Sequence, residues 1–194
     1  MGKHVEYRPE WVREDFIDFL TEKVNPLWAW KKAKARIVAK HHLSDDFVYM
    51  QLQPNHHFKA TDYQAGQSIL VTVLIAGVRW QRSYSIVEIL ENGNLVIAVK
   101  QQGKVSNALT QQPVKSVVEI SKPQGEFVLK SQLHSALMIA SGSGITAIYA
   151  LIKAALKRPQ TVSNIDLIYF TRDDAFHAEL QQLTEHYPQF KYHH

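Results

Sequence analysis

Residues 79–101 read RWQRSYSIVEILENGNLVIAVKQ and decide the fold of this chain. Both halves of the stretch are rich in β-branched and alternating apolar residues, which is typical of strands. Asn92-Gly93 stands between the two apolar runs, and this dipeptide is a strong signal for a tight hairpin turn. The stretch therefore predicts two antiparallel strands joined by a turn at residues 92–94.

Four further runs of the same texture flank this hairpin. RIVAKH, DFVYMQLQP and SILVTVLI precede it, and SVVEISKP follows it. Turn residues separate the runs, among them Ser44-Asp45-Asp46, Ala65-Gly66 and Ala76-Gly77. Six short strands at this spacing favour an antiparallel barrel or sandwich. We expect an all-β antiparallel barrel over residues 34–132.

The texture changes again after this barrel. ALMIAS is a continuous apolar run, as expected of a strand buried on both faces, and it leads through Gly142-Ser143-Gly144 into the helical run ITAIYALIKAALK. IDLIYF is a second buried strand, and a helix is predicted near residues 174–186. Alternating strands and helices predict a parallel sheet, so residues 133–194 form an α/β unit.

This α/β unit is small for an independent domain. It holds two predicted parallel strands and a third that begins at Phe190. A sheet of this size leaves its apolar helices poorly covered. We therefore expect residues 133–194 to be the N-terminal part of a larger, truncated domain.

Residues 1–33 are predicted to form a helical arm. Pro9 suits a first helical position, and Asn25-Pro26 ends the pattern. Apolar side chains recur at helical spacing between them, at Val12, Phe16, Phe19, Leu20 and Val24.

Composition excludes several classes of site and leaves the role of one charge cluster open. The chain has 194 residues and no cysteine, which excludes a disulfide scaffold, a thiolate zinc site and a cysteine-ligated iron–sulfur cluster within it. A net charge of +4 is unevenly placed, with a cluster at Lys31, Lys32, Lys34, Arg36 and Lys40. This cluster suits an acidic protein, a nucleotide phosphate or a solvated face, and nucleic acid ranks last because no aromatic stacking platform accompanies it.

Neither a membrane segment nor a metal site is predicted. No apolar run approaches the ~20 residues of a membrane span, and the first residues lack the apolar core of a signal peptide. The sequence thus predicts a soluble cytoplasmic protein. The ten histidines include adjacent pairs, which do not chelate readily from a strand, and we assign no metal.

The tetrapeptide Arg82-Ser83-Tyr84-Ser85 is the first candidate for chemistry. On a strand, Arg82 and Tyr84 point one way while Ser83 and Ser85 point the other. An arginine fork suits a pyrophosphate, and a tyrosine two residues later can lie against a flat ring. Taken alone, such a tetrapeptide is a weak signal.

A second segment, about twenty residues after Arg82–Ser85, strengthens the signal of that tetrapeptide. Gly103 permits a tight turn, and Ser106 suits the N-cap of a short helix through Leu109. The free N–H groups at such a helix start form an anion site. Arg82 and this helix start could clamp a diphosphate from two sides.

Four motifs in order carry a family resemblance. R-x-Y-S, G-x-V-S-x-x-L, P-x-G-x-F and G-x-G-I-T together resemble the ferredoxin–NADP reductase superfamily, over roughly residues 25–186. The oxygenase and fatty-acid desaturase reductases that carry a plant-type ferredoxin domain are the most similar subgroup. Asn25-Pro26-Leu27-Trp28 and Ala65-Gly66-Gln67 resemble that subgroup as well.

The resemblance implies FAD as the cofactor. Arg82 would bind its pyrophosphate, Tyr84 would pack against the isoalloxazine and ribityl chain, and Ser85 would hydrogen-bond near flavin N5. Ser85 and Tyr84, with Thr146, would be the catalytic residues. Further cofactor contacts are implied at Lys100, Gly103, Lys104, Val105 and Ser106.

The pattern G-x-G-x-x-A spans residues 142–147 and lies between a predicted strand and a predicted helix. This context is typical of a nucleotide-binding loop, and we call it the nucleotide loop. The resemblance implies that it holds the pyrophosphate of a nicotinamide nucleotide and that Thr146 borders both nicotinamide and flavin. Ser141 and Ala147 depart from the glycine and proline that are common there. Arg172 follows the second buried strand and favours NADPH, because a basic residue suits the 2′-phosphate. Asp173 and Asp174 follow immediately and point the other way, since an acidic residue would choose NADH through the 2′-hydroxyl. The implied nucleotide contacts are Gly142, Ser143, Gly144, Ile145, Thr146 and Arg172.

These expectations describe a flavin-dependent reductase. Electrons would pass from NAD(P)H through FAD to an iron–sulfur carrier of the ferredoxin type, a [2Fe–2S] group held in a missing downstream domain, and then to an oxygenase or desaturase. The alternative is a non-catalytic binding or docking module that kept the barrel, although intact Arg82, Tyr84, Ser85 and Ser106 speak against it. A flavin-free Rossmann dehydrogenase is excluded because the nucleotide motif follows a barrel.

Overall fold

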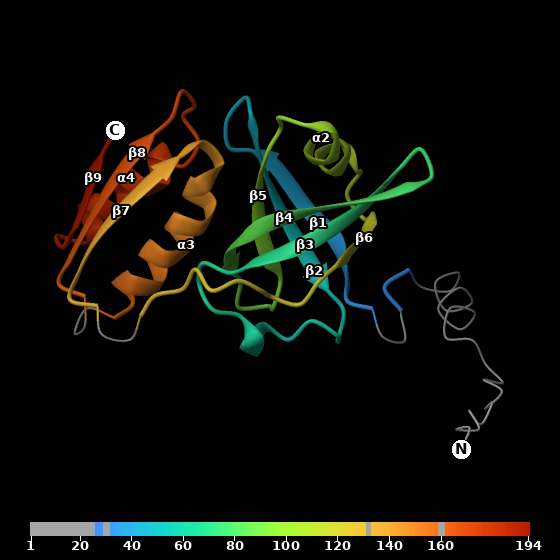
Figure 1. The fold of residues 1–194 in the computed structure, drawn as a ribbon, viewed down its shortest axis with the longest axis horizontal. Helices are drawn as coiled ribbons and strands as arrows, with labels where there is room; N and C mark the ends of the chain where they lie inside the picture. Colours follow the sequence, from blue (N-terminus) through green and yellow to red (C-terminus); the bar gives the residue numbers. More distant parts are fainter. Residues whose placement is uncertain (1–25, 29–31, 131–132, 159–161) are drawn as a thin grey trace, which may run out of the picture.

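The computed structural model describes residues 26–28, 32–130, 133–158 and 162–194. A β-barrel and an α/β unit lie side by side, with α3 between the barrel and the sheet (Figure 1). The helix predicted over residues 9–24 lies outside the described residues, as does Lys31 of the basic cluster.

The barrel is closed and antiparallel, with strand order β1-β2-β5-β4-β3-β6. The six predicted strands are confirmed. They form a barrel and not the sandwich that the sequence left as the alternative. A short helix, α2 (Lys104–Gln111), follows β5, and a 3-10 turn, η1 (Ala60–Asp62), precedes β3. The strands are β1 (Lys34–His42), β2 (Phe47–Pro54), β3 (Ser68–Ile75), β4 (Val78–Ile89), β5 (Leu95–Lys100) and β6 (Val117–Ile120).

Strand β5 joins the barrel to the rest of the molecule because both of its faces are buried. Leu95, Ile97 and Val99 belong to the core inside the barrel. Val96 and Ala98 alternate with them and belong to a second core, which includes α3 and the parallel sheet. The unbroken apolar run of this strand therefore reflects two cores that meet across it.

The second unit is a parallel sheet with the order β7-β8-β9. It confirms the predicted strand–helix alternation, including a third strand that begins at Phe190. Its elements are β7 (Ser135–Ser141), the 3-10 turn η2 (Gly142–Gly144), α3 (Ile145–Leu156), β8 (Asn164–Phe170), α4 (His177–His186) and β9 (Phe190–His193).

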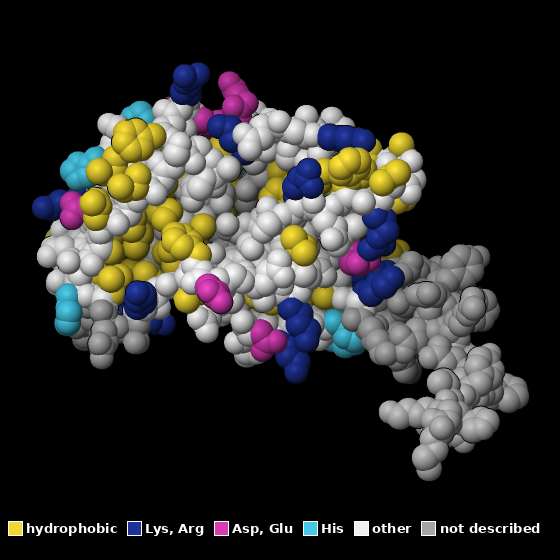
Figure 2. Space-filling model, viewed as in Figure 1, with side chains coloured by type: hydrophobic (Ala, Val, Ile, Leu, Met, Phe, Trp, Pro, Cys, Tyr) yellow, Lys and Arg dark blue, Asp and Glu magenta, His cyan; other side chains and the backbone are white. Residues whose placement is uncertain are grey.

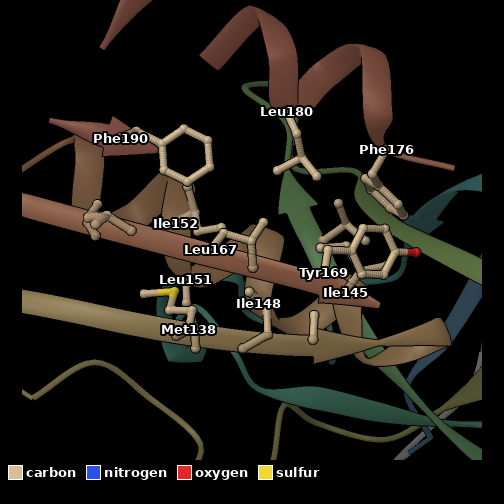
Figure 3. Close-up of a cluster of buried hydrophobic side chains, with 14 of the residues drawn as sticks. Met138, Ile145, Ile148, Leu151, Ile152, Leu167, Tyr169, Phe176, Leu180 and Phe190 are labelled. Carbon is tan, nitrogen blue, oxygen red and sulfur yellow. The ribbon is translucent and has the colours of Figure 1, made fainter. Parts of the chain in front are cut away.

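Both helices cover the same face of this sheet. Met138, Leu167 and Tyr169 point to that face and pack with Leu151 of α3 and Leu180 of α4 in one cluster (Figure 3). Right-handed crossovers between neighbouring parallel strands place successive helices on one side, which explains the arrangement.

No element of the described residues covers the opposite face of the sheet. Leu137, Ile139 and Phe170 are 66%, 59% and 62% exposed, and hydrophobic side chains gather over this end of the molecule (Figure 2). The expectation that the helices would be poorly covered was wrong for α3, whose apolar residues are buried between sheet and barrel. The apolar surface that lacks a cover belongs to the strands.

The loop before β3 reaches the joint between the two units. Gly66 has a φ of +95°, and a Cβ at this position would lie 2.0 Å from the carbonyl oxygen of Phe127 and 2.8 Å from Cδ2 of Leu151. Only glycine fits this backbone conformation and this space. Within the described ranges, no helix has the length and apolar character needed to cross a membrane.

Candidate active site

A cavity of about 550 Å³ opens where the barrel meets the η2–α3 turn. Its volume lies in the range of small-molecule and cofactor pockets. Side chains and backbone of β4, β5, the start of α2 and the η2–α3 turn line it. They are Trp80, Arg82, Ser83, Tyr84, Ser85, Ala98, Lys100, Gln102, Gly103, Lys104, Val105, Ser106, Ser143, Gly144 and Thr146.

Strand β4 supplies one wall of this cavity. The Arg82 guanidinium donates from Nη1 to the carbonyl oxygen of Gln81 at 2.8 Å. Tyr84 is half-buried, and this burial raises the pKa of its phenol to about 12 while the positive charge of Arg82 acts in the opposite direction. Tyr84 is therefore a neutral hydroxyl at physiological pH, able to donate a hydrogen bond. Ser83 also lines the cavity, and its Oγ donates to Oγ of Ser68 on β3 at 2.8 Å.

The start of helix α2 forms the facing wall, and it begins earlier than predicted. The helix starts at Lys104 with Gly103 as its N-cap, so the prediction of Ser106 as N-cap was wrong. Extended backbone at Gly103 lets Oγ of Ser106, the third helical residue, fold back and accept the N–H groups of Gly103 at 3.0 Å and Gln102 at 3.3 Å. The N–H groups of the first helical turn have no partners within the helix, and the residues that carry them line the cavity, so this helix start suits an anion.

Three cationic side chains and no carboxylate are found among the described residues that line this cavity. Besides Arg82, Nζ of Lys100 lies 3.9 Å from a carboxylate oxygen of Asp46. Nζ of Lys104 lies 4.5 Å from the centroid of the Trp80 ring, a cation–π contact. The cavity is consequently positive and suits an anionic ligand.

The nucleotide loop adopts the predicted strand–turn–helix arrangement. Ser143, Gly144 and Thr146 line the cavity, and Thr146 Oγ1 donates to the carbonyl oxygen of Ser143 at 2.9 Å. Ile145 was expected among the nucleotide contacts, but its side chain is fully buried in the hydrophobic core. The backbone N–H of Ile145 is also occupied, because it donates within the turn to the carbonyl oxygens of Gly142 and Ser143.

Gly142 and Arg172 line a second, neighbouring cavity of about 470 Å³. It lies at the carboxyl ends of β7 and β8, where ligands of open α/β sheets usually bind. The Tyr169 hydroxyl donates to the carbonyl oxygen of Gly142 at 3.3 Å, and Lys100 lines both cavities. The remaining lining residues are Ser141, Phe170, Thr171 and His194.

The structure thus brings the predicted residues together in two adjoining cavities, with Ile145 as the exception among side chains. Sequence reasoning missed Trp80, Ser83, Ala98 and Gln102 in the first cavity. Strand alternation could have found Trp80, because it stands two residues before Arg82 and shares its face of β4.

Comparison with known proteins agrees with this geometry. Residues 34–129 match the oxidoreductase FAD-binding domain family. The chain belongs to the ferredoxin–NADP reductase superfamily. A superfamily member similar in sequence is the flavohemoprotein of Burkholderia sp. (strain TH2), 29% identical over 177 residues that cover 88% of this chain and 44% of that protein. Another is the NADPH oxidoreductase of Mycobacterium tuberculosis, 30% identical over 179 residues, or 86% of this chain and 46% of that protein.

Solved structures share the superfamily fold. The cytochrome b5 reductase domain of Ulva prolifera nitrate reductase superposes with a TM-score of 0.72 at 24% identity, covering 84% of this chain and 72% of that one. The flavohemoglobin of Malassezia yamatoensis, solved with bound FAD and heme, gives a TM-score of 0.75 at 21% identity, covering 90% of this chain and 48% of that one. The chain spans about half the length of the curated relatives that it matches.

The residues of the first cavity fit FAD. Arginine and a helix N-terminus suit its diphosphate, and a neutral tyrosine suits its ring system. The indole Nε1 of Trp80 is buried, and no described residue accepts its hydrogen bond. A donor left without a partner in a cavity wall is consistent with a ligand that carries acceptors.

Proposed function

We propose that this chain binds FAD in the first cavity and acts as the flavin-binding part of an NAD(P)H-dependent electron-transfer reductase. One observation carries the proposal. The Arg82–Ser85 segment, the N-terminus of α2 and the η2–α3 turn, which are separate in sequence, line one positive cavity. The match of residues 34–129 to an oxidoreductase FAD-binding domain supports the same cofactor.

Each wall of the cavity is proposed to hold a different part of the cofactor. Arg82 and the first-turn N–H groups of α2 would neutralise the diphosphate from two sides, with Lys100, Gly103 and Val105 around it. Tyr84 would pack against the flavin as an uncharged ring, and Ser85 would orient it by hydrogen bonding. Bound FAD would supply the conversion of a two-electron donor's hydride into single electrons.

The second cavity is proposed to receive the nicotinamide nucleotide. Gly142 lines this cavity, and Ser143, Gly144 and Thr146 of the same turn line the first. The turn therefore borders both proposed sites, with the backbone N–H groups of residues 142–144 as the proposed phosphate donors. We propose that Arg172 reads the adenosine ribose and favours NADPH, because a guanidinium suits a 2′-phosphate.

For the electron acceptor we propose a one-electron carrier. A ferredoxin-type iron–sulfur carrier that serves an oxygenase or desaturase is the first candidate, on the resemblance of residues 25–28 and 65–67 to reductases of that kind. Relatives whose names include cytochrome b5 reductase and flavohemoprotein make a heme protein the second candidate. We also propose that residues 1–33, 34–132 and 133–194 are the arm, the flavin barrel and the nucleotide-binding part.

Flavin titration of the purified chain tests the proposal. We expect the protein to take up FAD with a flavin absorbance spectrum, and Arg82→Gln to weaken FAD binding at least tenfold. Arg79→Gln is the matched control, since Arg79 lies on the same strand but pairs with Glu119 at 2.7 Å outside the cavity. A parent protein that takes up no FAD refutes the proposal.

Reduction of the bound flavin separates the reductase from the docking-module alternative. Anaerobic mixing with NADPH or NADH should bleach the flavin absorbance, faster with NADPH. FAD that stays oxidised with both nucleotides, in a chain extended to the length of its relatives, would favour the non-catalytic module.

A further inference from the structure

A third cavity, of about 590 Å³, opens at one end of the barrel and takes no part in the proposed flavin and nucleotide sites. It shares no lining residue with the other two cavities. The segment before β1, the turn after β2 and the end of β6 meet there, and the backbone N–H of Ile120 donates to the carbonyl oxygen of Ala33 at 2.9 Å. The lining residues are Lys32, Ala33, His56, His57, Lys59, Glu119, Ile120 and Lys122.

Basic side chains dominate the lining of this third cavity. Lys32, Lys59 and Lys122 come one from each of the three segments, and two adjacent histidines add ring nitrogens. The one carboxylate among the described lining residues belongs to Glu119, which pairs with Nη2 of Arg79 at 2.7 Å. Its charge is therefore balanced from outside the cavity, and the cavity itself is positive.

The basic cluster that the sequence places before and within β1 does not form one surface. Nζ of Lys34 donates to a backbone carbonyl oxygen at 3.3 Å, and Nζ of Lys40 donates to two carbonyl oxygens at the C-terminal end of α2, both at 2.9 Å. Lys32 of that cluster lines the third cavity. The two lysines that join it there are distant in sequence, so the charge pattern did not reveal this site.

Asn55 holds the walls of the third cavity in place. Its Oδ1 accepts hydrogen bonds from the backbone N–H groups of Lys34 and His57, each at 3.2 Å. Its Nδ2 donates to the carbonyl oxygens of Leu27 at 3.1 Å and Lys32 at 3.0 Å. One amide thus joins the segment before β1 to the turn after β2 and uses its whole hydrogen-bonding capacity. The basic side chains start from a fixed backbone, which lowers the cost of ordering them around a ligand.

The lining suits a small ligand that carries phosphate. Lysine ammonium groups bind phosphate as point charges, and three of them from three segments match a ligand with several negative charges. The lysines line a concave cavity in the size range of small-molecule pockets. A small anion fits such a cavity better than the broad surface of an acidic protein.

We propose that the third cavity binds a small polyvalent phosphate, at a site separate from the flavin and nucleotide sites. The three lysines neutralise its charge. The rings of His56 and His57, whose centroids lie 3.9 Å apart, donate hydrogen bonds to its oxygens. The bound anion bridges the three segments and thereby stabilises the folded barrel. FAD binding is not required for this site.

Calorimetric titration of the full chain with inorganic triphosphate tests the inference. The site variant is Lys59→Met with Lys122→Met, which removes two of the three ammonium groups. Its matched control is Lys157→Met with Lys191→Met, because these two exposed lysines lie outside the cavity and take away the same net charge. All titrations use one low ionic strength, so that screening is equal. Thermal unfolding of each ligand-free variant verifies that it is folded.

We expect triphosphate to bind to the parent protein and the site variant to bind it at least about tenfold more weakly, because charge-assisted hydrogen bonds are lost. The control variant should stay within about twofold of the parent, since exposed distant charges are screened. Triphosphate should raise the melting temperature of the parent and the control variant more than that of the site variant. Saturating FAD and NADPH should leave triphosphate bound.

The outcomes that overturn the inference are distinct from failure of the flavin site. Absence of triphosphate binding, or equal weakening in the site and control variants, shows that the cavity is not a phosphate site. Displacement by FAD or NADPH places the triphosphate in one of the other two cavities. Polyglutamate that binds more tightly than triphosphate indicates an acidic protein partner in its place. A chain that takes up no FAD but binds triphosphate as expected refutes the proposed function alone.

Discussion

Nζ of Lys153 on α3 lies 2.5 Å from a carboxylate oxygen of Glu88 on β4, and this ion pair crosses the joint between the barrel and the α/β unit. The pair is partly exposed, so water screens its attraction. Apolar packing of α3 against Val87, Val96 and Ala98 in one buried core also joins the two units.

Removal of this ion pair should therefore cost little stability. We expect Glu88→Gln to lower the free energy of unfolding by about 0.2–1 kcal/mol, as is usual for partly exposed pairs. Urea denaturation of Glu88→Gln, Lys153→Met and the double variant gives the coupling energy between them. A coupling above about 2 kcal/mol would show that the pair, and not the apolar contact, dominates the joint.

Gly66 should be far more sensitive than the ion pair. A Cβ at Gly66 meets the Phe127 carbonyl oxygen at 2.0 Å, and its φ of +95° is unfavourable for any other residue. We expect Gly66→Ala to lower the free energy of unfolding by more than about 2 kcal/mol, since strain and steric clash add. Urea denaturation measures it.

Gly93→Ala is the matched control for this substitution. Gly93 also has a positive φ, +80°, but a Cβ there meets nothing within 4 Å. We expect Gly93→Ala to lower the free energy of unfolding by about 1 kcal/mol, from the backbone conformation alone. Equal losses at the two glycines would contradict the steric role of Gly66.

Tyr84 should make stability depend on alkaline pH. Burial raises the pKa of Tyr84 from 10 to about 12 in the folded protein. Between these two values the folded state holds the proton that the unfolded chain releases, so the free energy of unfolding falls as the pH rises from 10 to 12.

We expect Tyr84→Phe, which has no phenol to ionise, to lose less stability over this pH window than the parent protein. Urea denaturation at pH 8, 10, 11 and 12 measures the difference, with pH 8 as the common reference. Tyr63 and Tyr149 have similarly raised pKa values, so some loss should remain in the variant. Parallel curves for variant and parent would contradict the buried state of Tyr84.

Much of the fold could be predicted from sequence because its signals are local. Asn92-Gly93 between two apolar runs predicts the β4–β5 hairpin, and a strand, a glycine turn and an apolar helix predict the β7–α3 segment. The closure of six strands into a barrel is not local, and the sequence left it open against a sandwich.

The errors at the site have physical causes beyond the local pattern. Ser106 reads as an N-cap, but extended backbone at Gly103 starts the helix earlier and turns the serine into a third-position partner. Ile145 sits inside the nucleotide motif, yet helix geometry turns its side chain into the core. The contact between the Trp80 ring and Nζ of Lys104 joins residues that are distant in sequence, so the local pattern does not reveal it.

The uncovered sheet face gives a last prediction, about association. Leu137 and Ile139 alternate with Met138 on β7, so they point to the exposed face while Met138 is buried beneath the helices. Exposed apolar patches on a sheet edge strand favour self-association.

We expect the double variant Leu137→Lys and Ile139→Lys to remain folded. It should associate less than the parent 194-residue chain in sedimentation velocity, and it should bind less of a hydrophobic dye. Met138→Lys is the matched control, one residue away on the same strand. It places a charge in the core and should lower the free energy of unfolding by several kcal/mol. If the double variant unfolds as readily as Met138→Lys, the face that carries Leu137 and Ile139 is covered in solution, and the uncovered sheet face described above is wrong.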